Sequence, residues 1–473
     1  MLLTTRRFLP TAKTVLLDTT TEKIITLART LRFEDLSPLA IRAAKARILS
    51  TLAVSLAAYD MPPVKIVRKL AQPVAAGPAA RIFGSLTATT PDMAAFVNSA
   101  MVRCLDMSDS YVMSAVSHPA DAFSSILAVA EAAHCSGREL LLATALIYEV
   151  QCRFVEVVPY NHHGWDQTPV VALGAAIGCA RLLGLDDTQM RHAISLAVTP
   201  NIALNQTRTG RLSMWKGMAG PQGARGGVFA AYLAREGMTG PDNIFEGKFG
   251  FWNQLMHGES FNLPLPVDFS NHTFAVQQTM IKSFPTRFNC QVPVFTAQKL
   301  RSMVDINQIA TLKIESIRQA FARWMDLPEI WKPETRESAD HSLPCTVAMG
   351  LIDGTITPAM MEHDRFKDAD VLALMARCTI ELPDEFADLA PETRCCRLTA
   401  TLHNGEQVVA ETRRSLADDV ADPGWTQAVD KFNILTVPLL TTSARVALSA
   451  WVDELENQSG VAELVTLTRL QAD

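Results

Sequence analysis

The sequence lacks several patterns that would assign it to a familiar class of protein. Its nine cysteines form no C-x-x-C pair, and no Cys/His set has the spacing of a zinc finger. No apolar run reaches the roughly 18–20 residues that a membrane span needs. The glycine-rich stretch 217–227 contains no G-x-x-x-x-G-K-[ST] phosphate loop. The odd, scattered cysteines predict reduced thiols in a reducing compartment, and no membrane association is expected.

Positive charge is also scarce. The chain has 43 Lys+Arg against 49 Asp+Glu, a net charge of −6, so a nucleic-acid-binding surface is not expected. Local clusters of basic residues therefore carry more information than they would in a basic protein. With 473 residues, 48 % of them hydrophobic, the chain can bury a large core, and two domains are expected.

The basic residues near the start of the sequence allow two interpretations. Residues 1–17 contain Arg6, Arg7 and Lys13 and no acid. This composition is found in mitochondrial presequences, but it also fits a frayed basic tail. We therefore expect a cytoplasmic protein, or a mitochondrial one if these residues are a presequence.

Sequence periodicity predicts a mainly α fold with an α+β insertion. Residues 21–277 predict helices, with Ser37-Pro38 as a start signal and an Ala/Gly-rich, close-packed helix at 168–184. Residues 278–424 differ, because β-like runs alternate on both sides of Asn404-Gly405, which is a strong hairpin signal. The prediction also places strands at 310–317 and 375–382 and helices at 292–303 and 341–352. Residues 425–473 are helical again and are expected to return to the first helical domain.

The stretch LDMSDSYVMSAVSHPADAF (105–123) concentrates acids, hydroxyls and a histidine. Asp106 and Ser110 are four residues apart and would share one face at a helix end. Pro119 suits the first helical position, which makes His118 the N-cap. A helix N-terminus attracts carboxylates and disfavours imidazolium, so His118 would be neutral and able to act as a base. The alternative is that His118 only caps and Asp106 only bonds a neighbouring loop.

Three further stretches are candidates for binding or catalysis. NHHGWDQT (161–168) places Asp166 before a buried helix, as its N-cap or as a carboxylate tuned by burial; its adjacent histidines point apart, which disfavours metal binding. QTRTGRLSMWKG (206–217) offers Arg208, Arg211 and Lys216, either as a carboxylate clamp or as a solvated loop. MIKSFPTRFNCQ (280–291) places Lys282 and Arg287 at the expected domain boundary, where binding clefts often form.

With these residues in view, the chain resembles the MmgE/PrpD family, whose members include 2-methylcitrate dehydratases, cis-aconitate decarboxylases and iminodisuccinate epimerases. The resemblance extends over roughly residues 22–455 and rests on ordered blocks. They include LDMSDSYVMSAVSHPADAFSSILAVAEA, GWDQTPVVALGAAIGCARLLGL, TRTGRLSMWKGMAG, IKSFPTRFNCQ, ESADHSLPCTVAMGLIDG and NGEQVVAE. The resemblance implies an all-helical domain with an inserted α+β lid domain, a homodimer, and no metal, iron–sulfur or organic cofactor.

The resemblance also implies roles for individual residues. The expected catalytic residues are His118, Asp106, Lys282 and Asp166, and the expected substrate-binding residues are Ser110, Arg208, Lys216 and Arg287. Departures from the family pattern occur at Gln167, Arg287 and Asn289, where dehydratases often have His, Glu and His. Decarboxylase relatives have His at the place of Asp166.

The implied function is that of a lyase acting on a small di- or tricarboxylate, most simply a dehydratase of a 2-methylcitrate- or citrate-like hydroxy acid. Proton abstraction next to a carboxylate would also serve a cis-aconitate-type decarboxylase or an iminodisuccinate-type epimerase. The departures at Gln167, Arg287 and Asn289 leave open a protein of another class, a carboxylate binder without catalysis.

Overall fold

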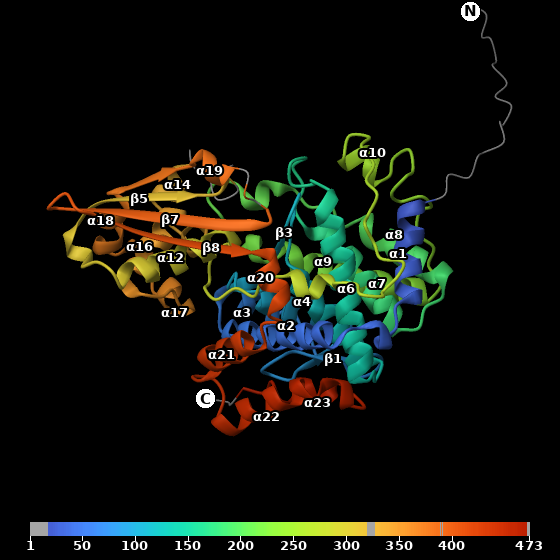
Figure 1. Cartoon of the computed structure of the whole chain (residues 1–473). Helices are drawn as coiled ribbons and strands as arrows, with labels where there is room; N and C mark the ends of the chain where they lie inside the picture. Colours follow the sequence, from blue (N-terminus) through green and yellow to red (C-terminus); the bar gives the residue numbers. More distant parts are fainter. Residues whose placement is uncertain (1–17, 319–326, 388, 390, 471–473) are drawn as a thin grey trace, which may run out of the picture.

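The computed structural model describes residues 18–318, 327–387, 389 and 391–470 (Figure 1). The protein is mainly α, with 56 % of its residues in helices. The basic residues that suggested a presequence lie in 1–17, outside the described residues. Within the described part of the chain, no helix is long and apolar enough to cross a membrane. All nine cysteines are buried and free, in accord with the predicted reduced thiols.

Residues 18–280 form a bundle of helices. Local signals begin several of them: Ser37 accepts from the Ala40 amide, and Ser136 and Glu139 form a capping box. The helices are α1 (Thr19–Thr30), α2 (Pro38–Ala57), α3 (Pro62–Arg68), α4 (Pro91–Cys104), α5 (Phe123–Ala132), α6 (Gly137–Val157), α7 (Thr168–Leu182), α8 (Asp187–Val198), α9 (Ala219–Arg235), α10 (Phe251–Leu255) and α11 (Ala275–Gln278). Two short hairpins, β1 (Ala80–Arg81) with β2 (Ala88–Thr89) and β3 (Tyr111–Val112) with β4 (Val116–Ser117), interrupt them.

The Ala/Gly-rich helix predicted at 168–184 is α7, and it lies in the close-packed centre of the bundle as expected. A Cβ atom added to Gly227 of α9 would lie 2.4 Å from the Ala175 Cβ and 2.7 Å from the Ala172 carbonyl oxygen. The absence of that side chain lets α7 and α9 approach closely along their buried faces.

A four-stranded sheet forms after residue 308. Its order is β6-β5-β7-β8, with β5 and β6 parallel and the other pairs antiparallel. The strands are β5 (Ile309–Ser316), β6 (Cys378–Glu381), β7 (Thr393–Leu402) and β8 (Gln407–Ser415). The predicted hairpin is confirmed, with Gly405 at φ +87° in its turn. The strand predicted at 375–382 is shorter, because Met375 belongs to the last turn of the preceding helix α18 (Ala369–Met375).

Helices α12 (Gln291–Arg301) and α16 (Leu343–Asp353) lie along the sheet in Figure 1 and contribute Val294 and Val347 to its core. Shorter helices complete this part of the chain: α14 (Pro328–Trp331), α15 (Arg336–Ala339), α17 (Pro358–Glu362), α18 (Ala369–Met375), α19 (Asp384–Ala387) and α20 (Leu416–Ala421).

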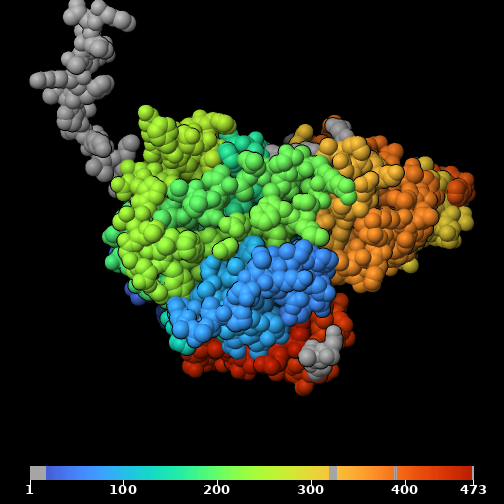
Figure 2. Space-filling model, turned by 180° about the vertical axis from the view of Figure 1, so that it is seen from behind, coloured from blue at the N-terminus to red at the C-terminus, as the bar shows by residue number. Residues whose placement is uncertain are grey.

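The C-terminal helices pack against the first bundle. They are α21 (Trp425–Thr436), α22 (Thr442–Asp453) and α23 (Ala462–Thr466). One hydrophobic core joins Leu49 of α2 to Phe432 of α21, and a second core, from Phe284 to Ala410, surrounds the sheet. In the space-filling view the orange and gold part forms one lobe beside the green and blue bundle, and the red helices lie beneath the blue ones (Figure 2).

Candidate active site

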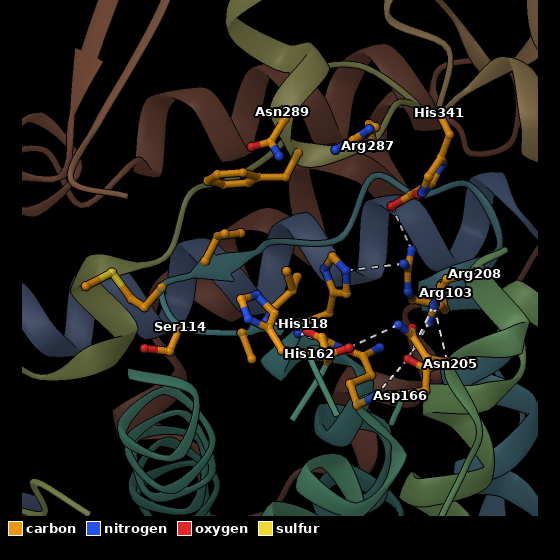
Figure 3. A pocket seen from close by; sticks show the side chains of 18 of the residues that line it. Arg103, Ser114, His118, His162, Asp166, Asn205, Arg208, Arg287, Asn289 and His341 are labelled. Carbon is orange, nitrogen blue, oxygen red and sulfur yellow. Dashed lines mark hydrogen bonds and ion pairs between the residues drawn. The ribbon is translucent and has the colours of Figure 1, made fainter. Parts of the chain in front are cut away.

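A cavity of about 250 Å³ lies where the helical bundle meets the sheet-containing part. Figure 3 shows Arg287, Asn289 and His341 on one side and His162, Asp166 and Asn205 on the other, with His118 and Arg103 between them. The lining is formed by Arg103, Asp106, Val112, Met113, Ser114, Ala115, Val116, His118, Asn161, His162, Asp166, Gln167, Asn205, Arg208, Lys282, Arg287, Phe288, Asn289 and His341. The cavity is therefore built from segments that are far apart in the sequence.

The stretch 105–118 is a loop and a hairpin rather than a helix end. Helix α4 ends at Cys104, and Asp106 has φ +53°, in the left-handed region. The expectation that Asp106 and Ser110 share a helix face is therefore wrong. Instead, Ser110 pairs through both backbone groups with Met280, at N···O distances of 3.1 and 3.0 Å.

The β3–β4 hairpin then returns the chain so that His118 lies beside Ser110. His118 is the N-cap of the 3₁₀ helix η2 (Pro119–Ala122), with Pro119 at the first position, as predicted.

The contacts of His118 define its tautomer. Its Nε2 lies 3.2 Å from Arg103 Nη2, which can only donate, and its Nδ1 lies 3.0 Å from the Asp109 carbonyl oxygen, which can only accept. Nδ1 therefore carries the proton, and the Nε2 lone pair is directed toward Arg103 at the cavity wall. Ser110 Oγ adds a contact of 2.8 Å to Nδ1. Burial, followed by the charges of Arg103 and Lys282, lowers the pKa of His118 well below its usual value, so the imidazole is neutral as expected.

Asp106 is the anionic centre of the site. Its Oδ1 accepts from Arg103 Nη1 at 2.7 Å and from Lys282 Nζ at 2.6 Å, and its Oδ2 lies 3.0 Å from Lys216 Nζ. Burial alone would raise the pKa of Asp106, but these three cations outweigh it and hold the pKa well below the usual value. Asp106 is therefore an ionised, buried carboxylate.

Lys282 lies at the cavity, as predicted, and is fully buried. It has 0 % exposed surface and also donates to the Asp106 carbonyl oxygen at 3.0 Å. A lysine at a domain boundary usually supports little packing, but the strand-like pairing of Met280 with Ser110 draws Lys282 into the interior. Burial lowers the pKa of Lys282, while the Asp106 carboxylate opposes that shift.

Lys216 also belongs to a buried ionic cluster and not to a solvated loop. From the 3₁₀ helix η4 (Met214–Gly217) its Nζ donates to Asp340 Oδ1 at 2.6 Å and lies 3.1 Å from His341 Nδ1. Asp106, Asp340 and His341 have a composition that could ligate a metal ion. The side-chain ammonium of Lys216 contacts all three of these residues, so in this structure they bind a lysine side chain.

The Asp166 side of the cavity is a second ionic cluster. Gln167, not Asp166, is the N-cap of α7, and Asp166 Oδ1 accepts from the Gln167 amide at 2.7 Å. Arg208, in the 3₁₀ helix η3 (Asn205–Arg208), lies 3.2 Å from the Asp166 carboxylate. The Gln167 side chain accepts from the His118 amide at 3.2 Å and donates to Asp121 at 2.9 Å. The departure at Gln167 thus supports the His118 backbone.

The predicted site residues occupy two positions relative to the cavity. His118, Asp106, Lys282, Asp166, Arg208 and Arg287 line the cavity, whereas Ser110 and Lys216 lie behind it against His118 and Asp106. Sequence reasoning missed Arg103, Asp340 and His341. Arg103 is three residues before Asp106 at a helix end, and the adjacent Asp340 and His341 precede an apolar helix, but neither pattern is specific.

Comparison with known proteins assigns the family. The model of the MmgE/PrpD N-terminal domain matches residues 22–264, and that of the MmgE/PrpD C-terminal domain matches residues 284–457. The chain belongs to the MmgE/PrpD family, as the motifs predicted.

Named relatives include two kinds of lyase. The 2-methylcitrate dehydratase of Escherichia coli strain K12 is 28 % identical over 436 residues, 85 % of this chain and 87 % of the relative. The 2-methylcitrate dehydratase of Cupriavidus necator is 28 % identical over 79 % of this chain and 81 % of its own. The cis-aconitate decarboxylase of Mus musculus is 25 % identical over 83 % of this chain and 81 % of its own.

Replacing Asp106 by Asn tests the charge cluster independently of activity. Asp106→Asn leaves three buried cations without their shared carboxylate, and we expect a loss of about 3–5 kcal/mol in the free energy of unfolding at pH 7. Because the pKa of Asp106 is lowered in the folded state, its contribution is present above its unfolded pKa of about 3.9 and disappears as the pH falls through the folded value. Urea unfolding of both proteins should therefore give curves that converge in acid.

The matched control is Asp92→Asn. Asp92 pairs with Arg225 at 3.1 Å, but the two side chains are 21 % and 42 % exposed, so a loss of about 0–1 kcal/mol is expected. Equal losses for the two variants would show that the Asp106 cluster contributes no more than a surface ion pair.

Proposed function

We propose that this protein is a cofactor-independent lyase that abstracts a proton next to a carboxylate of a small di- or tricarboxylate. Its proposed reaction is the dehydration of a 2-methylcitrate- or citrate-like hydroxy acid. The observation that carries the proposal is the neutral His118, whose Nε2 accepts from Arg103 at the wall of a cavity that Lys282 and Arg287 also line. The names of the relatives support the same class of substrate.

The charges of the cavity favour a polyanion. Its lining has four cationic side chains (Arg103, Arg208, Lys282 and Arg287) and two carboxylates, which already take part in ion pairs. Substrate carboxylates would therefore enter a site with an excess of positive charge. A bound carboxylate near His118 would also raise the lowered pKa of the imidazole, which would make it a stronger base at the moment of reaction.

The proposed chemistry follows from these groups. His118 Nε2 takes the proton from the carbon next to a substrate carboxylate, and the electron pair forms the C=C bond as the C–O bond breaks; the hydroxyl leaves as water after taking a proton from the imidazolium of His118. Charge that develops on the carboxylate is stabilised by Arg103 and Lys282. Loss of CO₂ would make the protein a decarboxylase. Return of the proton on the other face of the same carbon would make it an epimerase. Asp166, where the resemblance implies His in decarboxylases, lends decarboxylation no support.

The same proposal includes the domain organisation. We assign residues 21–277 and 425–473 to the helical domain and 278–424 to an inserted α+β lid. The two separate hydrophobic cores, and the position of Arg287 and His341 opposite His118, support this division. Buried, free cysteines support a reducing compartment such as the cytoplasm, with a mitochondrial location as the alternative if residues 1–17 are a presequence.

The function is tested by ultraviolet assay of citrate, 2-methylcitrate, cis-aconitate and iminodisuccinate. We expect turnover of at least one hydroxy acid to an unsaturated product, and a decrease of about 10²–10⁴-fold in kcat for His118→Gln because the proton acceptor is removed. Thermal stabilisation by these acids without any product would instead indicate a carboxylate binder. Absence of both effects would rule out this substrate class.

Replacement of Lys282 separates its charge from its packing. Lys282→Met keeps the length of the side chain, so kcat/KM should fall about ten- to a hundredfold, the worth of one charge-assisted contact; the melting temperature should also fall, because Asp106 loses one of its three buried cations. Lys282→Ala should lose similar activity and more stability, because it also leaves a cavity. Lys313→Met is the control, since Lys313 is 37 % exposed on β5. Normal activity of Lys282→Met would remove Lys282 from the mechanism.

We also propose that the protein is a homodimer, as the family resemblance implies. Exposed apolar side chains such as Trp215 (50 % exposed) and Phe229 (57 % exposed) on the helical domain support this proposal. Light scattering at micromolar concentration should give about twice the chain mass of 51.7 kDa. A mass of one chain would contradict the proposal.

A further inference from the structure

We infer that Lys431, in the C-terminal helix α21, is a positioning residue for the loop that orients His118, an inference that rests on the proposed function. Lys431 is 6 % exposed, and its Nζ donates to the Met107 carbonyl oxygen at 2.6 Å and to Ser50 Oγ at 3.0 Å. Its pKa is lowered to about 7, chiefly by burial. The neutral amine still has N–H groups, so the bond to Met107 persists in either protonation state.

Met107 lies between the two parts of the loop that form the site. The residue before it is Asp106, and the Asp109 carbonyl, two residues after it, holds His118 Nδ1 at 3.0 Å. Ser110 follows and contacts the same nitrogen at 2.8 Å. A displacement of the backbone at Met107 would therefore shift two groups. One is the Asp106 carboxylate, which binds the three cations, and the other is the Asp109 carbonyl, which defines the tautomer of His118.

The rest of the loop is supported from other directions. Lys282 holds the Asp106 carbonyl, Met280 pairs with Ser110, and the Asp109 side chain accepts from the Ala120 amide at 3.3 Å. Lys431 adds the support at Met107 from helix α21, 324 residues further along the chain.

This arrangement gives the returning C-terminal helices a role at the site. Helix α21 packs against α2, which supplies Ser50, and the two lie side by side in Figure 1. A buried lysine that served only to join α21 to α2 would need no contact with the 105–110 loop. Lys45 of α2 is a buried lysine that serves for comparison. It is 4 % exposed, donates to the carbonyl of Asp453 at the end of α22 and pairs with Glu456 at 2.5 Å.

The experiment compares Lys431→Met with Lys45→Met in the full-length protein. Both changes remove a buried amine that joins α2 to the C-terminal segment, so both should lower the melting temperature. Only Lys431→Met is expected to lower kcat, by about tenfold or more, with KM changed less than about twofold, because misplacement of the base acts on the chemical step. Lys431→Gln retains an N–H donor and serves if the methionine variant does not fold; its loss should be smaller than tenfold.

Amide hydrogen exchange provides a readout that does not depend on turnover. Peptides spanning residues 105–118 should exchange faster in Lys431→Met than in the unaltered protein, and at the normal rate in Lys45→Met. If the unaltered protein turns over none of the four acids, the proposed function fails, while the exchange result still decides the role of Lys431. Unchanged kcat and exchange in Lys431→Met, or equal effects in Lys45→Met, would overturn the inference.

Discussion

The buried carboxylate of Asp106 is the constraint on which the site depends. A charge with 2 % exposure is tolerated only if other charges and hydrogen bonds compensate for its lost hydration. Arg103, Lys216 and Lys282 provide that compensation from the end of α4, from η4 and from the segment that leads to the second core. Each of these segments is therefore held in place by the same carboxylate, and two of the three cations, Arg103 and Lys282, also line the cavity.

The division of the chain into two hydrophobic cores explains the place of the cavity. Side chains within each core pack at high density, so space for a ligand remains where the cores meet and polar groups gather. Lys216 of the bundle and Asp340 of the sheet-containing part form an ion pair across this boundary. The contact fixes the wall that carries Arg287 and His341 relative to His118 (Figure 3).

His118 combines two properties that a proton-transfer group needs. Its orientation is defined by an acceptor at Nδ1 and a donor at Nε2, and its neutral state follows from burial beside cations. The sequence suggested a neutral imidazole from the helix dipole, but the helix η2 has one turn, and burial is the larger cause. The imidazole of His118 is therefore both held in one orientation and unprotonated.

Sequence alone determined the features that depend on neighbouring residues. Ser37-Pro38 begins α2 and Asn404-Gly405 forms the hairpin turn, because capping and turn conformations are decided over a few residues. The ordered motifs assigned the family and marked His118, Asp106 and Lys282. The helix face predicted for Asp106 and Ser110 was wrong, and the full burial of Lys282 was not foreseen. Backbone pairing between 110 and 280 decides both positions.

Arg103, Asp340, His341 and Lys431 emerged only from the tertiary structure. Their partners lie as far as 324 residues away, as for Lys431 and Met107. Local sequence preferences extend over a turn or a hairpin, whereas burial and charge compensation depend on which distant segments the fold brings together. The sequence therefore determined the elements and the chemical inventory, and the packing of two cores decided which charges are buried, paired or directed into the cavity.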